Sequence, residues 1–253
     1  MPAISSRPKL CPCVSAVLLY QNLGLPKKAY IPAGHCAPML LSRQLDFMAE
    51  RGWQATALSS VVERCKCGDV AEQNEFCITF DDGYESVHRV AYPALRDHDM
   101  TATVYVAAGS IGGSTGWDER LARRAEPIMT SEQIRELADN GFEIGSHTLS
   151  HLRLTALSDK SLKRELLDSK LRLEDITGKE VKSLSYPYGY YDQRVIDACI
   201  EAGYESAVCR KLATVSRAIN PFEIPRISVR WNTIGAVLLR NIGHGYSERE
   251  HND

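Results

Sequence analysis

Two adjacent carboxylates, Asp81 and Asp82, follow the apolar stretch 76–80 and precede Gly83. An apolar run of this length that ends at a turn residue predicts a buried strand. The acids therefore stand where the strand ends, and Gly83 can take the backbone conformation that a tight turn needs. Carboxylates this close repel one another unless a cation or a shared proton relieves them. An Asp-Asp-Gly sequence is also an ordinary turn, so its partners decide between the two interpretations.

Two histidines, His147 and His151, lie four residues apart directly after a strand predicted over 142–144. If their segment forms one helical turn, both imidazoles point to the same side. Such a pair alone also fits a surface or core feature. Together with the carboxylate of Asp82, however, two imidazoles leave open positions on a divalent ion, as catalytic metal sites do. The sequence therefore predicts that these three side chains share a metal ion.

These groups must be positioned by strands that end at one edge of a sheet. Strand and helix patterns alternate along the chain, which predicts parallel strands joined by crossover helices. A barrel-like α/β domain is expected, with an open doubly wound sheet as the alternative. Pro93 is expected to bend or split its helix, and residues 111–127 are expected to form a loop-rich lid. The strands are predicted over 14–20, 53–58, 76–80, 101–107, 142–144, 181–185, 205–209 and 227–229, and the helices over 39–51, 59–64, 85–97, 130–140, 158–177, 192–202 and 231–241.

Length and charge exclude several classes of protein. The chain has 253 residues, which suits a single domain over 1–253 with a core over about 14–241 and polar ends. A formal net charge of -2 argues against a strongly electrostatic nucleic-acid binder. No apolar run approaches the roughly 20 residues that a membrane span needs. The N-terminus lacks the apolar core of a secretory signal, so a cytoplasmic location is expected unless an upstream leader was removed.

The eight cysteines raise the question of a second metal site. Cys11 and Cys13 form one closely spaced pair, and Cys65 and Cys67 form another. Structural zinc sites usually have about two to four residues between paired cysteines, and these pairs have one. Free thiols are therefore the favoured interpretation.

Three motifs in this order, Thr79-Phe-Asp-Asp-Gly83, Ser146-His-Thr-Leu-Ser-His151 and Tyr186-Pro-Tyr-Gly189, resemble the polysaccharide deacetylases of the NodB-homology type, carbohydrate esterase family 4. The likeness runs from about residue 14 to 229 and includes the stretches 141–145 and 223–228. The resemblance implies a distorted (β/α)7 barrel and a metal-dependent hydrolase that removes N-acetyl groups from an amino sugar or glycan. It also implies a divalent metal, zinc first, with cobalt, nickel or iron as alternatives.

The resemblance also assigns roles to individual residues. It makes Asp82, His147 and His151 the metal ligands and Asp81 the general base. It also implies that the backbone N–H of Tyr188 donates a hydrogen bond to the oxyanion of the tetrahedral intermediate. No partner other than an N-acetylated sugar or glycan is expected, and the oligomeric state is left open.

Two positions depart from the family pattern. Many relatives carry an arginine where Ser185 stands, and that arginine orients the catalytic aspartate; the branch with Tyr-Pro-Tyr-Gly lacks it. In that branch a histidine after the first strand's tyrosine is the general acid, but here Gln21 follows Tyr20. His35 could reach the site from the next loop. The remaining histidines are expected at the surface: His88, His98, His244 and His251.

The missing acid keeps other functions open. One is a deformylase or cyclic-amide hydrolase that acts on a small intracellular substrate. Another is a glycan-binding protein whose catalysis is weakened by Gln21.

Overall fold

A parallel sheet forms the centre of the computed structural model, which describes residues 16–24, 36–67, 74–117, 125–211 and 220–229, together with 233, 235 and 238. Seven of its strands follow one another in the order β7-β6-β5-β4-β3-β1-β8, and β2 pairs with the first residues of β3. All of these pairings are parallel. The strands are β1 Ala16–Tyr20, β2 Gln54–Ala55, β3 Glu75–Phe80, β4 Thr103–Val106, β5 Glu143–Ser146, β6 Ser183–Ser185, β7 Ser206–Val208 and β8 Ile227–Ser228.

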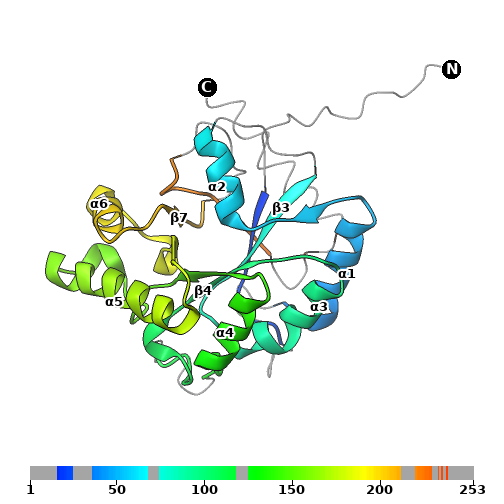
Figure 1. Cartoon of the computed structure of the whole chain (residues 1–253), viewed down its shortest axis with the longest axis horizontal. Coiled ribbons are helices and arrows are strands. Elements are labelled where there is room, and N and C mark those ends of the chain that lie inside the picture. Colours follow the sequence, from blue (N-terminus) through cyan, green and yellow to red (C-terminus); the bar gives the residue numbers. More distant parts are fainter. Residues whose placement is uncertain are drawn as a thin grey trace.

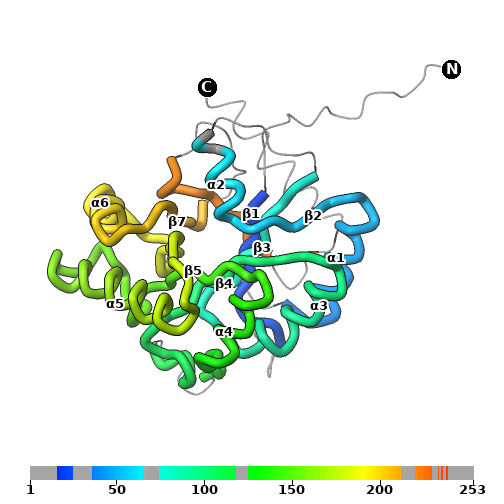
Figure 2. The backbone as a smooth tube through the Cα atoms, viewed as in Figure 1, coloured from blue at the N-terminus to red at the C-terminus, as the bar shows by residue number. Residues whose placement is uncertain are grey.

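The two edges of this sheet are joined by one short segment, residues 224–228. Ile224 forms a parallel bridge with Val208 of β7, and three residues later Ile227 pairs with Leu18 of β1. The sheet therefore curls until the segment that contains β8 contacts both β1 and β7. Figure 2 shows the path of the chain around these strands. This confirms the predicted α/β fold of the distorted-barrel type and leaves no place for the open doubly wound alternative.

Helices surround the sheet (Figure 1). In that view α1 and α3 lie on one side of it, α5 and α6 on the other, and α4 and α2 at opposite ends. Crossover helices of this kind cover the outer face of a parallel sheet, as the alternating sequence pattern predicts. Their bounds are α1 Pro38–Ala49, α2 Leu58–Cys67, α3 Tyr92–Arg96, α4 Ser131–Asp139, α5 Asp159–Thr177 and α6 Gln193–Glu201.

Capping residues explain where these helices begin and end. Thr130 and Gln133 form a reciprocal capping box at the start of α4, and the Ser158 side chain accepts a hydrogen bond from Ser161 N–H at the start of α5. Gly178, at φ 64°, ends α5 in the left-handed conformation. The predicted split at Pro93 is confirmed: a π-helical turn, Val87–Ala91, precedes α3, because proline cannot donate the backbone bond that would continue a regular helix.

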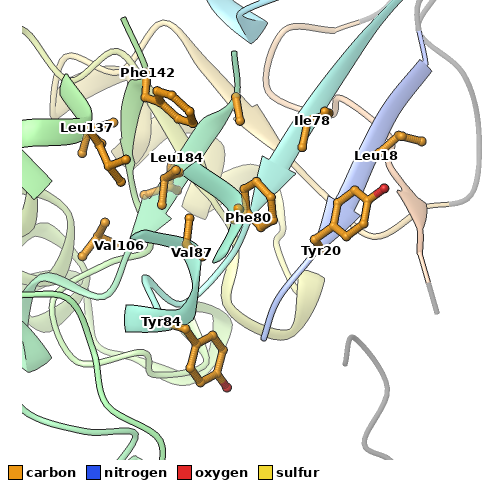
Figure 3. Close-up of a cluster of buried hydrophobic side chains, with 14 of the residues drawn as sticks. Leu18, Tyr20, Ile78, Phe80, Tyr84, Val87, Val106, Leu137, Phe142 and Leu184 are labelled. Atoms are coloured by element: carbon orange, nitrogen blue, oxygen red, sulfur yellow. The ribbon is translucent and has the colours of Figure 1, made fainter. Parts of the chain in front are cut away.

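The core lies on both faces of the strands. All five residues of β1 and all but the first of β3 are buried, which is the pattern of strands covered on both sides. Figure 3 shows part of this core, where the rings of Tyr20 and Phe80 pack with centroids 5.4 Å apart. Among the described residues, no helix has both the length and the apolar character that a membrane crossing requires.

Some sequence-based expectations differ from the structure or lie beyond it. The strand predicted over 53–58 shortens to β2, two residues long, and residues from Leu58 onward join α2. The predicted helix 231–241 falls almost entirely outside the described residues. The same holds for Cys11 and Cys13, so the free thiols that we expect at these two positions stay a prediction. Four other cysteines are buried and form no disulfide: Cys36, Cys77, Cys199 and Cys209.

Candidate metal centre and catalytic site

Three strand ends bring the candidate residues to one edge of the barrel. β3, β5 and β6 are parallel, so their carboxyl ends face the same way. Asp81 and Asp82 directly follow β3, His147 directly follows β5, and the turn that contains Tyr188 follows β6. Catalytic side chains collect at this edge in parallel barrels, because the loops there are free to vary.

Asp82, His147 and His151 converge on one point. The Asp82 Oδ1 atom lies 3.3 Å from Nε2 of His147 and 3.3 Å from Nε2 of His151. All three side chains are buried, and one ligand atom from each lies within 4.8 Å of the others. Asp82 Oδ1 accepts no hydrogen bond from the part of the chain that the structure describes. A buried carboxylate oxygen facing two imidazole nitrogens has the donor set and the unmet need that a divalent cation satisfies.

A hydrogen bond on the far side of one ring orients it for this purpose. His147 Nδ1 lies 2.7 Å from the carbonyl oxygen of Ser185, so Nδ1–H donates to that carbonyl. The proton on Nδ1 leaves the lone pair of Nε2 free to point at Asp82, which is how metal-binding histidines are commonly held.

The loop that carries the histidines is not a helical turn, so the two imidazoles meet for a different reason than the one that their spacing offered. Thr148 and His151 have left-handed backbones, with φ of 66° and 56°. The loop is instead held by hydrogen bonds from Thr148 N–H to Ser146 Oγ at 3.1 Å and from His151 N–H to Thr148 Oγ1 at 3.2 Å. Glu165 of α5 accepts the Ser150 N–H at 2.8 Å.

Left-handed backbone is concentrated at this site. Six non-glycine residues of the described chain have positive φ, and four of them are Asp82, Thr148, His151 and Tyr188. Residues other than glycine, asparagine and aspartate rarely adopt this backbone conformation, and backbone strain of this kind is concentrated at functional sites. The backbone here is therefore shaped to aim side chains, at a cost of about 1–3 kcal/mol per residue.

The charges at the site are strongly coupled. Burial opposes the ionisation of Asp82, but the two neighbouring imidazoles outweigh it and hold the pKa of this carboxyl well below its usual range. Burial also opposes a charge on His147, yet Asp81 and Asp82 together raise the pKa of its imidazole. At His151 burial wins, and the pKa of the imidazole is lowered. The carboxylate is thus kept ionised, as a metal ligand must be.

Asp81 forms a buried ion pair with an arginine that we did not predict from the sequence. Arg226 is 1% exposed; its Nη1 donates to Asp81 Oδ1 at 2.7 Å and its Nη2 to Oδ2 at 2.8 Å. The same guanidinium donates to Thr79 Oγ1, to Ser185 Oγ and to the carbonyl of Cys209. This two-pronged pairing fixes the plane of the carboxylate, and the charge of Asp81 outweighs burial to raise the pKa of Arg226.

Arg226 resolves the first departure from the family pattern. The arginine absent at position 185 is replaced by one that enters from residues 224–228 and reaches the Ser185 hydroxyl at 2.9 Å. The available sequence signal was the family-like stretch 223–228, which contains Arg226 but gives no indication of its partner 145 positions away.

Aromatic rings enclose His151. The ring of Tyr188 meets it edge-on with centroids 4.8 Å apart, and the ring of Trp117 stacks on it at 4.8 Å and 28°. Tyr188 lies in the turn Pro187–Gly189 at φ 60°, and its side chain is 45% exposed. Trp117 was not predicted as a site residue, since it belongs to the loop expected to form a lid, and residues 118–124 of that loop lie outside the described chain.

The other two histidines of the described chain, His88 and His98, lie outside this group. His88 pairs with Glu136 and His98 with Asp46, both at 2.9 Å and both between surface elements. His35, His244 and His251 lie outside the described residues. Gln21 stands directly after β1 and is partly exposed.

The fold and the buried Asp-His-His group together have the form of a hydrolytic metal centre at the carboxyl end of a parallel barrel. The family model described as "Polysaccharide deacetylase" matches residues 69–207. The chain belongs to the polysaccharide deacetylase family. The matched range contains all five residues that the resemblance assigned, and it ends before Arg226.

Two curated relatives carry the same kind of name. The chain is 33% identical over 152 residues to the putative polysaccharide deacetylase YxkH of Bacillus subtilis, which covers 60% of this chain and 50% of that protein. It is 25% identical over 161 residues to a poly-β-1,6-N-acetyl-D-glucosamine N-deacetylase of Staphylococcus aureus, and this match covers 60% of this chain and 53% of that protein. The chain thus spans about half the length of these relatives.

Solved structures show the same fold. The Streptococcus pyogenes deacetylase PplD, in complex with acetate, superposes with a TM-score of 0.81 at 22% identity, covering 92% of this chain and 99% of that one. IcaB from Ammonifex degensii gives a TM-score of 0.78 at 19% identity, covering 90% and 96%. The predicted family and architecture are therefore confirmed.

Proposed function

We propose that this chain is a metal-dependent hydrolase that removes N-acetyl groups from an amino sugar of a glycan. One observation supports it most directly: three buried ligand atoms converge beside a second carboxylate that a buried arginine holds in a fixed plane. Family membership and the names of the curated relatives support the same reaction.

Each residue at the site has a distinct task in this proposal. Asp82 Oδ1 and the Nε2 atoms of His147 and His151 hold a divalent metal, with zinc first and cobalt, nickel or iron as alternatives. When bound, such an ion polarises the amide carbonyl and lowers the pKa of coordinated water towards ~7. Asp81 accepts the proton of the attacking water, and Arg226 keeps its carboxylate aligned for this step. The backbone N–H of Tyr188 donates to the developing oxyanion.

The leaving amine must still gain a proton. Glutamine cannot supply one, so Gln21 does not replace the histidine of the related branch, and the loss of a general acid costs typically ~10²–10⁴-fold in rate. This favours slow hydrolysis, or help from His35. It also keeps glycan binding with weakened catalysis as the second candidate function.

Acetate release tests the proposal. Purified protein loaded with zinc or cobalt is incubated with N-acetylglucosamine and its oligomers, and acetate is measured enzymatically. Asp82→Ala should abolish release and lower the affinity for the metal, whereas Asp139→Ala, an exposed acid of α4, should leave both unchanged. Release that persists in Asp82→Ala would refute the assignment. N-formyl and cyclic amides tested in parallel decide between deacetylase and deformylase.

Two further predictions stay open. The description of 1–253 as one domain is tested by limited proteolysis, and the cytoplasmic location by fractionation of cells with an antibody against the chain. The oligomeric state follows from light scattering of the same preparation.

A further inference from the structure

Exposed apolar side chains gather beside the candidate metal centre. Seven large hydrophobic side chains are exposed in the described part of the chain, and three of them are Leu152, Tyr188 and Tyr190, at 45%, 45% and 49%. The other four lie on the outer helices: Met39, Leu167, Leu171 and Ile200. Single exposed apolar residues are ordinary, but a group of them next to a polar site indicates a ligand contact.

The three residues belong to two chain segments that run side by side away from the metal ligands. Where the two segments leave the metal ligands, the rings of His151 and Tyr188 have centroids 4.8 Å apart. Two residues further along both segments, the guanidinium carbon of Arg153 lies 3.9 Å from the ring centroid of Tyr190. Two residues of backbone span at most about 7 Å, so the second contact lies within the reach of a neighbouring sugar ring.

Arg153 has donors to spare. Its guanidinium covers the ring of Tyr190, and no carboxylate of the described chain pairs with it. Other arginines differ in this respect: Arg164 pairs with Asp168, and Arg194 with Asp159. An arginine stacked on an aromatic ring keeps its N–H groups pointing outward in the plane of the guanidinium, where they can meet ligand oxygens.

We propose that Leu152, Arg153, Tyr188 and Tyr190, here called the aromatic shelf, bind the sugar residue next to the one that is deacetylated. A pyranose ring offers an apolar face of C–H groups, which suits the exposed rings, and a rim of hydroxyl oxygens, which suits the free donors of Arg153. The substrate is accordingly a glycan of at least two residues, not a free monosaccharide. This inference rests on the proposed function and narrows its substrate class.

Chain-length dependence tests the aromatic shelf. Acetate release is measured with N-acetylglucosamine and with its β-1,6- and β-1,4-linked tetramers, and kcat/KM of each tetramer is divided by that of the monomer. The kcat/KM of the wild-type protein should be higher for at least one tetramer than for the monomer. Tyr190→Ala and Arg153→Ala should each lower this ratio by about threefold to tenfold, mainly through KM, because a stacked aromatic contact is worth that much. Tyr190→Phe keeps the ring and should keep the ratio.

Matched controls separate the shelf from general surface effects. Arg164→Ala and Leu171→Ala remove an exposed arginine and an exposed leucine of α5, and both should leave the ratio at the wild-type value. Equal kcat/KM for monomer and tetramers in the wild type, or an unchanged ratio in Tyr190→Ala and Arg153→Ala, would overturn the inference.

A binding measurement keeps the test informative if no substrate is hydrolysed. Titration calorimetry of the tetramers into metal-free wild type, Tyr190→Ala and Arg153→Ala then measures the shelf alone. Weaker binding in both variants would support the shelf while the proposed function fails. Equal binding in all three proteins, or no binding to the wild type, would overturn the shelf.

Discussion

The buried pair of Arg226 and Asp81 gives the sharpest prediction. The guanidinium makes five hydrogen bonds, two to Asp81 and three to other oxygens. In Arg226→Lys the ammonium can donate at most three and cannot match both carboxylate oxygens at once. A hydrogen bond in which a charge takes part is worth about 1.5–3 kcal/mol, so two lost bonds to buried oxygens should lower the free energy of unfolding by about 3–6 kcal/mol.

The same change should slow catalysis. A misplacement of the reacting group by ~1 Å can cost about 10²-fold in rate. We therefore expect kcat of Arg226→Lys to fall by roughly that factor, with KM nearly unchanged, because Asp81 keeps a positive partner but loses its fixed plane. Acetate release gives the rate, and urea unfolding gives the free energy of unfolding of the same sample.

Arg164→Lys is the matched control. Arg164 also donates to a carboxylate, at 3.4 Å from Asp168, but both side chains are exposed, so this variant should stay within about 1 kcal/mol and near the wild-type rate. A wild-type kcat in Arg226→Lys would show that the two-pronged grip is not needed. A milder variant, Ser185→Ala, removes only one of the five bonds and should produce a smaller fall in kcat in the same direction, which tests the pair if Arg226→Lys does not fold.

Three further changes test other parts of the account. Gln21→His should raise kcat by up to ~10²–10⁴-fold if position 21 faces the leaving amine, and acetate release measures it. Gly145→Ala should destabilise the fold by about 1–3 kcal/mol in urea unfolding, because a Cβ there would lie 2.5 Å from the ring of Tyr105. Hydrogen bonds from Lys66 and Lys182 lower the pKa of Glu205 to about 2. The ionised carboxylate should therefore stabilise the fold above the unfolded pKa of about 4.3, and this contribution should be lost as the pH falls towards 2. Glu205→Gln should remove that dependence, at most about 1 kcal/mol for so exposed a pair, in unfolding measured across this pH range.

Each of these has an outcome that contradicts it. A kcat of Gln21→His equal to the wild type would place the general acid elsewhere. Gly116→Ala, which meets only one backbone oxygen at 3.9 Å, is the control for Gly145→Ala, and equal stability of the two would disprove the close approach of Tyr105. A pH dependence of stability that is the same in Glu205→Gln and the wild type would assign the acid sensitivity to other groups.

Local patterns in the sequence predicted much of this molecule. The run of apolar residues before Asp81 predicted β3, and the helical patterns over 130–140 and 158–177 predicted α4 and α5 to within a residue at either end. These features depend on neighbours within a few residues, which a sequence displays directly. The resemblance then supplied the family, and with it the expectation that distant strand ends meet.

What the sequence did not predict depends on contacts between distant residues or on unusual backbone. A helical turn at His147–His151, which the spacing left open, does not form because Thr148 adopts a left-handed conformation that its side chain does not favour. Ser146 and neighbouring loops hold Thr148 in that conformation. Arg226 meets Asp81 only because the sheet closes, and no local pattern reports that closure. The aromatic shelf likewise combines segments that lie far apart in the sequence.

The position of Arg226 in the chain has a consequence for biosynthesis. Asp82, His147 and His151 have all emerged once the first three-fifths of the polypeptide has been made, whereas the guanidinium that aligns Asp81 arrives with the strand that completes the barrel. A chain that ends before residue 224 therefore lacks both the segment that contacts β1 and β7 and the guanidinium that fixes the plane of Asp81. Closure of the barrel and alignment of this carboxylate thus depend on the same few residues.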